Sequence, residues 1–258
     1  MATYKKRGYK AKEVNIDSTD EVEFNEQDST TAEVFSTLDE SANKTEEWVS
    51  NNQNYILGVI GAIAVGVLGY LAYDQFVKKP QEADAGNEMF YAMQHFNEAL
   101  QNPVAQDSLY NMALEGANGK YGLIEVIENY GGTESANLAS YAAGMSYLNT
   151  QKYQEAIDYL SDYTAHDAIT DAIAKGGIGD AFMQLNQPED ALGYYEKALS
   201  ANTNEYSTPM FLQKAGIVAL ELNKNDAALK YFERIKTEFA KSPEASLVDA
   251  YIAMAKNK

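Results

Sequence analysis

The sequence contains no cysteine, only two histidines and only one tryptophan. The absence of cysteine excludes disulfides, thiolate metal sites, a catalytic thiol and the acylated N-terminal cysteine of a lipoprotein. His95 and His166 are far apart in the sequence, and neither has a second imidazole at ligand spacing. We therefore expect neither a metal nor a cofactor.

Positive charge is also scarce, since the formal net charge is −18. Residues 1–54 hold 6 Lys or Arg against 12 Asp or Glu, and residues 80–258 hold 12 against 25. An acidic surface of this kind repels phosphate backbones and has no basic stripe that releases counterions. We expect no DNA binding by the C-terminal part.

The sequence contains only partial matches to known catalytic and nucleotide-binding motifs. GGIGDA at residues 176–181 lies in a helical pattern and lacks the strand and the downstream acidic residue of a dinucleotide loop. GANGKYG near Lys120 has the wrong spacing for a phosphate loop. The neighbouring carboxylates of Glu189 and Asp190 fit the start of a helix better than an acid and base pair. We expect a protein that is not an enzyme.

One long hydrophobic run is present, YILGVIGAIAVGVLGYLAY at residues 55–73, and it contains no charge. As a helix it would extend about 28 Å, close to the roughly 30 Å thickness of a bilayer core. Its four glycines would each cost about 1 kcal/mol in a buried soluble helix, whereas membrane helices tolerate them. We predict a transmembrane helix over residues 55–77. Because 54 residues precede the run and no cleavage pattern follows it, we expect an uncleaved anchor.

Small residues recur on one face of this helix at Gly58, Ala62 and Gly66. Their spacing of four allows the backbone of a second membrane helix to approach closely, so we predict helix packing there. The alternative is ordinary small-residue content with no partner.

The N-terminal residues 1–30 are basic and then acidic, with few large apolar side chains to offset the entropy of ordering. We expect a disordered tail. Positive charges interleaved with tyrosines predict contact with anionic lipid or with the ribosome, through Lys5, Lys6, Arg7, Lys10 and Lys12.

Residues 31–54 show apolar side chains at three-to-four spacing, which predicts an amphipathic juxtamembrane helix.

Three segments after residue 130 can be laid over one another at offsets of about 35 residues, close to a 34-residue helix-turn-helix repeat. Small residues correspond in each segment and would lie where two helices cross: Gly144, Gly179 and Gly216, then Ala156, Ala191 and Ala228. The aligned positions Leu160, Tyr195 and Phe232 would fill the space between helices. Pro188, Pro209 and Pro243 mark helix starts.

These positions resemble the tetratricopeptide repeat family. We therefore predict an all-α chain: a single N-terminal transmembrane helix followed by a tetratricopeptide-like α-solenoid over residues 85–258. A degenerate helix pair would open the solenoid, formed by EMFYAMQHFNEAL and GKYGLIEVIENYGG with a short helix around Ser108 to Glu115 between them, and SPEASLVDAYIAMAKNK would close it.

In such a stack the first helix of each pair lines a concave groove. The predicted groove residues include no Lys or Arg, so they disfavour capture of a C-terminal carboxylate. Methionine and tyrosine suit adaptable contact with varied segments, unless neighbouring helices bury them. The candidate groove residues are Tyr141, Met145, Asn149, Asp180, Met183, Gln184, Met210, Gln213 and Glu221.

The order of these parts, from about Glu46 to Lys258, resembles the bacterial ancillary SecYEG translocon subunit family. The resemblance implies an inner-membrane protein with a cytoplasmic N-terminus and periplasmic repeats, which assists the passage of exported chains from the translocon to periplasmic chaperones. Lys78 and Lys79 against Lys44 favour the opposite orientation, whereas the six positive charges of the whole tail favour this one. The alternative function is a structural scaffold of an envelope or secretion complex without client binding.

Overall fold

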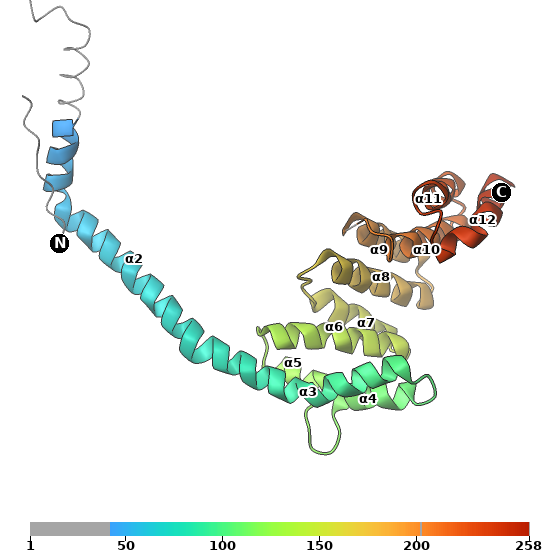
Figure 1. Ribbon diagram of the computed structural model, residues 1–258, viewed down its shortest axis with the longest axis horizontal. Coiled ribbons are helices and arrows are strands. Elements are labelled where there is room, and N and C mark those ends of the chain that lie inside the picture. Colours follow the sequence, from blue (N-terminus) through green and yellow to red (C-terminus); the bar gives the residue numbers. More distant parts are fainter. Residues whose placement is uncertain (1–41, 202, 258) are drawn as a thin grey trace, which may run out of the picture. The chain divides into compact units, whose positions relative to one another are not determined.

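The computed structural model of the chain describes residues 42–201 and 203–257 (Figure 1). It divides into two compact units, Met1–Leu68 and Gly69–Lys258, and each is described here by itself. The predicted tail, with its candidate contact residues between Lys5 and Lys12, lies outside the described residues. So does the part of the predicted juxtamembrane helix before residue 42.

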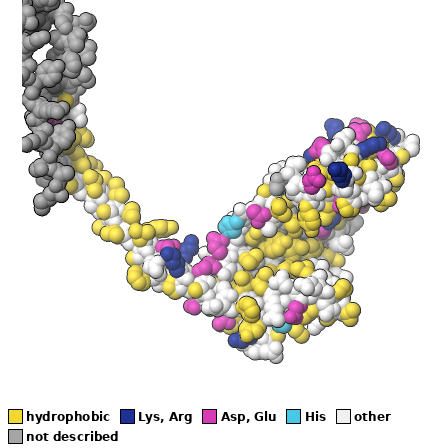
Figure 2. Space-filling view, in the orientation of Figure 1, with side chains coloured by type: hydrophobic (Ala, Val, Ile, Leu, Met, Phe, Trp, Pro, Cys, Tyr) yellow, Lys and Arg dark blue, Asp and Glu magenta, His cyan; other side chains and the backbone are white. Residues whose placement is uncertain are grey.

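The apolar run forms a helix whose side chains are mostly exposed. Residues 42–51 are helical, and α2 follows over Gln53–Tyr73 without a single buried residue. A side chain added at Gly58 or Gly66 would meet nothing within 4 Å. Among the described residues, the helical stretch Gln53–Gln101 contains an 18-residue window with a mean hydropathy of 2.2, which makes it long and apolar enough, by length and composition, to cross a membrane. Figure 2 shows hydrophobic side chains along this helix.

The helix does not end where the charged residues begin. A π-helical turn, η1, covers Asp74–Lys78, and α3 continues from it over Lys79–Gln101. Pro80 is tolerated because it lies in the first turn of α3, where a missing amide proton does no harm. α3 thus begins at Lys79, before residue 85, where the helical domain was predicted to begin.

Antiparallel helix pairs make up the rest of the chain. The pairs α6 with α7, α8 with α9 and α10 with α11 match the three predicted repeats. The opening pair differs from the prediction, because α3 packs on α4 while α5 packs mainly on α6. The bounds are α4 Gln106–Glu115, α5 Leu123–Asn129, α6 Glu134–Asn149, α7 Tyr153–Asp162, α8 Ala168–Gln184, α9 Pro188–Ala201, α10 Thr208–Glu221, α11 Asn225–Glu238, the 3-10 helix η2 Pro243–Leu247 and α12 Val248–Asn257.

The three repeat glycines lie where the helices of a pair cross. A Cβ on Gly144 would lie 2.6 Å from Leu160 Cγ, and one on Gly216 would lie 2.5 Å from Phe232 Cε1. At Gly179 the corresponding neighbour is Tyr195 Cε1, at 2.7 Å. Real Cβ atoms do not approach this closely, so each crossing requires a residue without a side chain. The repeat alanines Ala156, Ala191 and Ala228 are fully buried, as the predicted packing role requires.

The core is segmented. Its buried side chains form four clusters among the described residues, each shared by consecutive helices. The first joins α3 to α6, the next lies between α6 and α8, the third between α8 and α10, and the last between α10 and α12. This arrangement is typical of a repeat stack, in which each pair contacts only its neighbours.

A left-handed residue ends the first helix of each pair. Gln151, Asn186 and Asn223 have φ angles of 62°, 57° and 56° and occupy equivalent positions. The following amide donates to a carbonyl five residues back in every case, as in the bond from Lys152 to Tyr147 at 2.9 Å. The turns thus repeat in backbone geometry as well as in sequence, although sequence comparison alone did not single them out.

Candidate functional site

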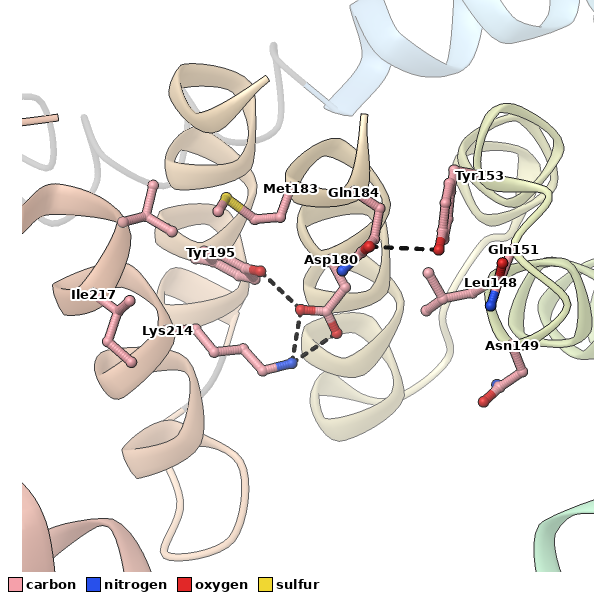
Figure 3. Close-up of a pocket in the computed structure, with 11 residues that line it drawn as sticks. Leu148, Asn149, Gln151, Tyr153, Asp180, Met183, Gln184, Tyr195, Lys214 and Ile217 are labelled. Atoms are coloured by element: carbon pink, nitrogen blue, oxygen red, sulfur yellow. Dashed lines mark hydrogen bonds and ion pairs between the residues drawn. The ribbon is translucent and has the colours of Figure 1, made fainter. Parts of the chain in front are cut away.

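A cavity of about 570 Å³ lies across the repeats between α6 and α10 (Figure 3). The ends of α6 and α8 supply one side of it, the start of α7 a second side, and α9 and α10 the remainder. Figure 2 shows hydrophobic side chains gathered on the hollowed face of the repeat unit. The cavity is lined by Leu148, Asn149, Gln151, Tyr153, Asp180, Met183, Gln184, Tyr195, Lys214, Ile217 and Val218.

Asp180 organises the polar part of the cavity. Its Oδ1 accepts a hydrogen bond from the Tyr195 hydroxyl at 2.7 Å, and its two oxygens accept from Lys214 Nζ at 2.7 and 2.6 Å. Asp180 and Lys214 each keep 33% of the side chain exposed. Because the three residues come from α8, α9 and α10, the contacts also join one repeat to the next.

Tyr195 remains a neutral donor in this arrangement. Its burial, and then the adjacent Asp180 carboxylate, raise the pKa of the Tyr195 hydroxyl far above its usual value. A hydroxyl that does not ionise keeps its proton and goes on donating a hydrogen bond to Asp180, so Tyr195 and Lys214 hold the carboxylate from two directions. The Asp180 and Lys214 side chains therefore present a paired, locally neutral group to the cavity.

Four of the predicted groove residues line this cavity, namely Asn149, Asp180, Met183 and Gln184. The others do not. Tyr141 packs on Tyr163 with ring centroids 5.1 Å apart, and Met145 packs against two core clusters. Met210 and Gln213 are partly buried on α10, and Glu221 is exposed at its last position. Tyr141, Met145 and Met210 are partly buried against neighbouring helices.

The predicted absence of Lys and Arg from the groove is wrong. Lys214 enters the cavity from α10, 34 residues after the carboxylate that it pairs with. Sequence analysis also missed Gln151 and Tyr153, because Gln151 lies in the turn after α6 and Tyr153 begins α7, so neither belongs to the first helix of a pair. The left-handed φ of Gln151 would have marked that turn, but it is not visible in a sequence.

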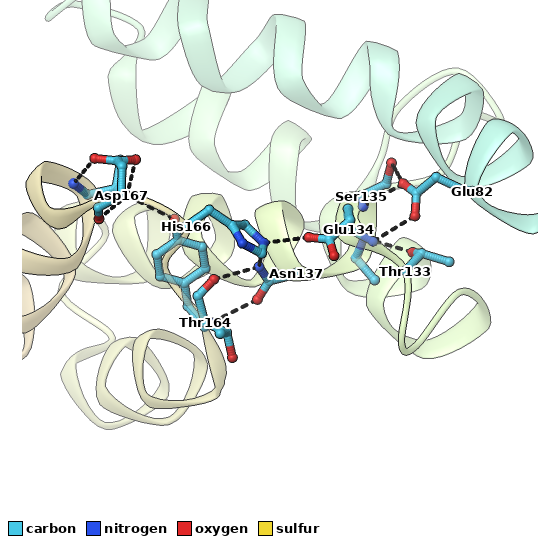
Figure 4. A network of polar contacts seen from close by, with 11 residues as sticks. Glu82, Thr133, Glu134, Ser135, Asn137, Thr164, His166 and Asp167 are labelled. Atoms are coloured by element: carbon cyan, nitrogen blue, oxygen red, sulfur yellow. Dashed lines mark hydrogen bonds and ion pairs between the residues drawn. The ribbon is translucent and has the colours of Figure 1, made fainter. Parts of the chain in front are cut away.

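A second polar cluster holds the N-terminus of α6 (Figure 4). The Glu82 carboxylate of α3 accepts hydrogen bonds from the amides of Glu134 and Ser135 at 2.7 and 2.8 Å, and from the Ser135 hydroxyl at 2.6 Å. Glu134 in turn contacts His166 Nε2 at 2.5 Å. These bonds join α3, α6 and the loop before α8 across more than 50 residues of sequence.

Replacing Glu82 with glutamine should reduce stability at neutral pH by about 1 kcal/mol, the usual contribution of a helix-capping side chain. Burial opposes ionisation, but the bonds from Ser135 and from the Glu134 and Ser135 amides hold the pKa of Glu82 below its ordinary 4.5. This stabilisation is therefore present above pH 4.5, and it is lost as the pH falls through the lower pKa that Glu82 has in the folded state. Denaturant midpoints measured from neutral to acidic pH will show the loss in the native chain.

An Asp84→Asn substitution on the same helix provides the control for this prediction, because Asp84 is exposed and its carboxylate accepts no hydrogen bond within the described residues. If Glu82→Gln and Asp84→Asn gave the same midpoints at every pH, the role of Glu82 as a cap would be contradicted.

Within residues 42–201 and 203–257, no group of three or more His, Asp or Glu side chains is arranged to hold a metal ion.

One comparison with known families matches this part of the chain. Residues 177–246, from within α8 to η2, match the tetratricopeptide repeat family. This region contains Gly179, Gly216, Ala191 and Ala228, so the repeat assignment predicted from them is confirmed there. No curated protein matches the chain. Tetratricopeptide repeats stack into extended surfaces that contact other proteins, so the match points to a protein-protein interaction role for residues 177–246.

Proposed function

We propose that the chain is a membrane-anchored tetratricopeptide-repeat adaptor that holds other polypeptides and performs no chemistry of its own. The observation that carries the proposal is α2, which has 21 residues and buries none of them. A soluble core helix of this composition would be covered by its own chain. An apolar helix without such cover fits a bilayer, where nine Ile, Leu and Val residues of the run favour insertion by roughly 3 to 5 kcal/mol.

The site of action in this proposal is the bacterial inner membrane, with the N-terminus in the cytoplasm and the repeats in the periplasm. The partners are a SecYEG-type translocon or another membrane complex, together with exported polypeptides or periplasmic chaperones. The order of anchor and repeats supports this proposal by resemblance. The cavity at Asp180 adds support, because its apolar and amide lining suits contact with polypeptides of varied sequence.

A photoreactive residue placed at Met183 tests the proposal in cells. Met183 lines the cavity, so it should crosslink to chains in transit through the membrane. The control position is Tyr206, which is 78% exposed and lies outside the cavity. Gentle detergent extraction with a C-terminal tag should in addition recover translocon subunits.

Two outcomes would overturn the proposal in different ways. Recovery of other envelope proteins, without crosslinks to exported chains from Met183, would favour the scaffold. Equal crosslinking from Met183 and Tyr206 would show that the cavity does not select clients.

A further inference from the structure

The two ends of the helix stack both expose apolar side chains. α3 opens the stack and α12 closes it, because the first core cluster joins α3 to α6 and the last lies between α10 and α12 (Figure 1). The terminal helices of a repeat stack usually carry a polar outer face, since no further repeat covers them. Apolar outer faces at both ends of the same stack therefore call for an explanation.

The opening end has an apolar depression of about 450 Å³ on α3. Met89, Phe90 and Met93 line it, and Glu98 of the same helix adds a carboxylate. Phe90 is 62% exposed, and its ring meets the neighbouring Tyr91 ring edge-on with the centroids 5.3 Å apart. An exposed aromatic ring among methionines is typical of a surface that contacts another molecule. We call this surface the opening face.

The closing end exposes apolar residues of α12. Ala250 and Met254 are four residues apart on this helix and both are exposed, Met254 by 52%. Leu247, immediately before α12, is 56% exposed. Another side of the helix is already occupied, because Val248 and Ala255 belong to the last core cluster. We call the surface formed by Leu247, Ala250 and Met254 the closing face.

Charge distinguishes the two ends. Residues 80–134, which contain α3 to α5, hold 1 Lys or Arg against 9 Asp or Glu. Residues 222–258, which contain α11 and α12, hold 7 against 5. Figure 2 shows Lys and Arg side chains among the charged groups over this second end of the repeat unit. The stack is therefore strongly acidic where it opens and slightly basic where it closes.

Two cations of the closing end have no acidic partner among the described residues. Lys241, just before η2, and Lys256, in the last turn of α12, are exposed and make no ion pair or side-chain hydrogen bond there. Lys236, in contrast, is paired with Asp249, with Nζ 2.6 Å from Oδ1. Unpaired ammonium groups on α12 and next to it favour an acidic partner surface.

We propose that copies of this chain associate head to tail, with the closing face of one copy docked on the opening face of the next. Apolar side chains of both faces leave water in this contact, and the surplus cations of one end meet the carboxylates of the other. Two opening ends would instead bring two strongly acidic surfaces together, which repel each other. The contact is heterologous, so each copy keeps one free end and the assembly can grow beyond two copies. It does not depend on the proposed translocon partner.

Single cysteines can report which surfaces meet, because the chain contains no cysteine of its own. Phe90→Cys and Met254→Cys are made in separately tagged full-length chains, reconstituted together into vesicles of uncharged lipid and treated with a short bifunctional maleimide. Since like ends do not meet in a head-to-tail contact, the mixture should give roughly tenfold more crosslinked pairs than either variant by itself. Equal crosslinking of Phe90→Cys with itself, or no crosslinking in the mixture, would overturn the proposal.

The charge complementarity has its own test. Adding Lys241→Gln and Lys256→Gln to the Met254→Cys chain should lower crosslinking to Phe90→Cys roughly tenfold, because two cations leave the contact. Lys152→Gln with Lys197→Gln is the matched control, since it removes the same charge from positions before α7 and on α9, outside both faces. Equal crosslinking by the two double variants would also overturn the proposal.

Anionic lipid is the competing ligand for the closing end. An environment-sensitive fluorophore on the Met254→Cys variant reports it, because insertion into a bilayer moves the dye from water to an apolar medium. A blue shift on addition of anionic vesicles, with no crosslinking in the mixture, would assign the closing face to the membrane and overturn the proposal. An unchanged spectrum, together with crosslinking in the mixture, would support a second copy as the occupant.

Discussion

Replacing Gly216 with leucine is expected to destabilise the chain by about 3 kcal/mol and to lower its melting temperature by roughly 6 to 12 °C. Even a Cβ at this position would lie 2.5 Å from Phe232 Cε1. The Phe232 ring is fully buried and stacks on Tyr251 at 5.0 Å, so it has no free space to move into. Thermal unfolding followed by circular dichroism measures the effect.

Gly193 supplies the matched control for this substitution. It also lies within a helix, α9, but a Cβ there would meet nothing within 4 Å. Gly193→Ala should therefore stabilise the chain by up to about 1 kcal/mol through helix propensity. If Gly216→Leu melted at the temperature of the native chain, the crossing at Phe232 would not be as close as described.

Replacing Ile63 and Ala64 with lysine should release the chain from the membrane. Each lysine at the centre of a span costs about 2.5 to 3.5 kcal/mol, and the pair outweighs the roughly 3 to 5 kcal/mol that the aliphatic residues supply. The altered chain should appear in the soluble fraction after alkaline carbonate extraction. The native chain should stay with the vesicles.

Lysines at Asn51 and Asn54 test whether position, and not charge alone, produces this release. Both residues precede the apolar run, where charge costs little because it remains in water. This control should stay in the membrane fraction. Release of the native chain itself by carbonate would contradict a membrane anchor.

The repeat part of the fold was predictable because its constraints are local. A glycine at Gly144, Gly179 or Gly216 and a large side chain about 16 residues later identify a helix crossing, and the structure places each pair in contact. The prolines were equally informative, since Pro188 opens α9 and Pro209 lies in the first turn of α10. Steric limits decide where glycine is needed at a helix crossing and where proline is tolerated at a helix start, so these residue types reveal such positions in a sequence.

The opening of the solenoid was harder to predict. The sequence comparison paired α3 with α5, but α4 occupies the place beside α3 and contributes the buried Tyr110 to its cluster. The Glu82 cap also joins residues more than 50 positions apart. Nothing in either segment alone indicates that a carboxylate from one helix will satisfy the amides of the other.

The candidate site was half predictable for a related reason. Positions on one face of α6 and α8 follow helical spacing, which singled out Asn149, Asp180 and Gln184, and all three line the cavity. Lys214 comes from the next repeat, and its direction depends on how two pairs stack. Helical spacing within one helix cannot report that stacking, so the charge balance of the cavity emerged only from the structure.

The division of the interior into successive clusters affects how such a chain can change in evolution. No single central core has to be preserved, so adding or deleting one whole helix pair alters only the two contacts at the point of insertion. A longer or shorter relative could therefore keep the same turns while presenting a different length of repeat surface.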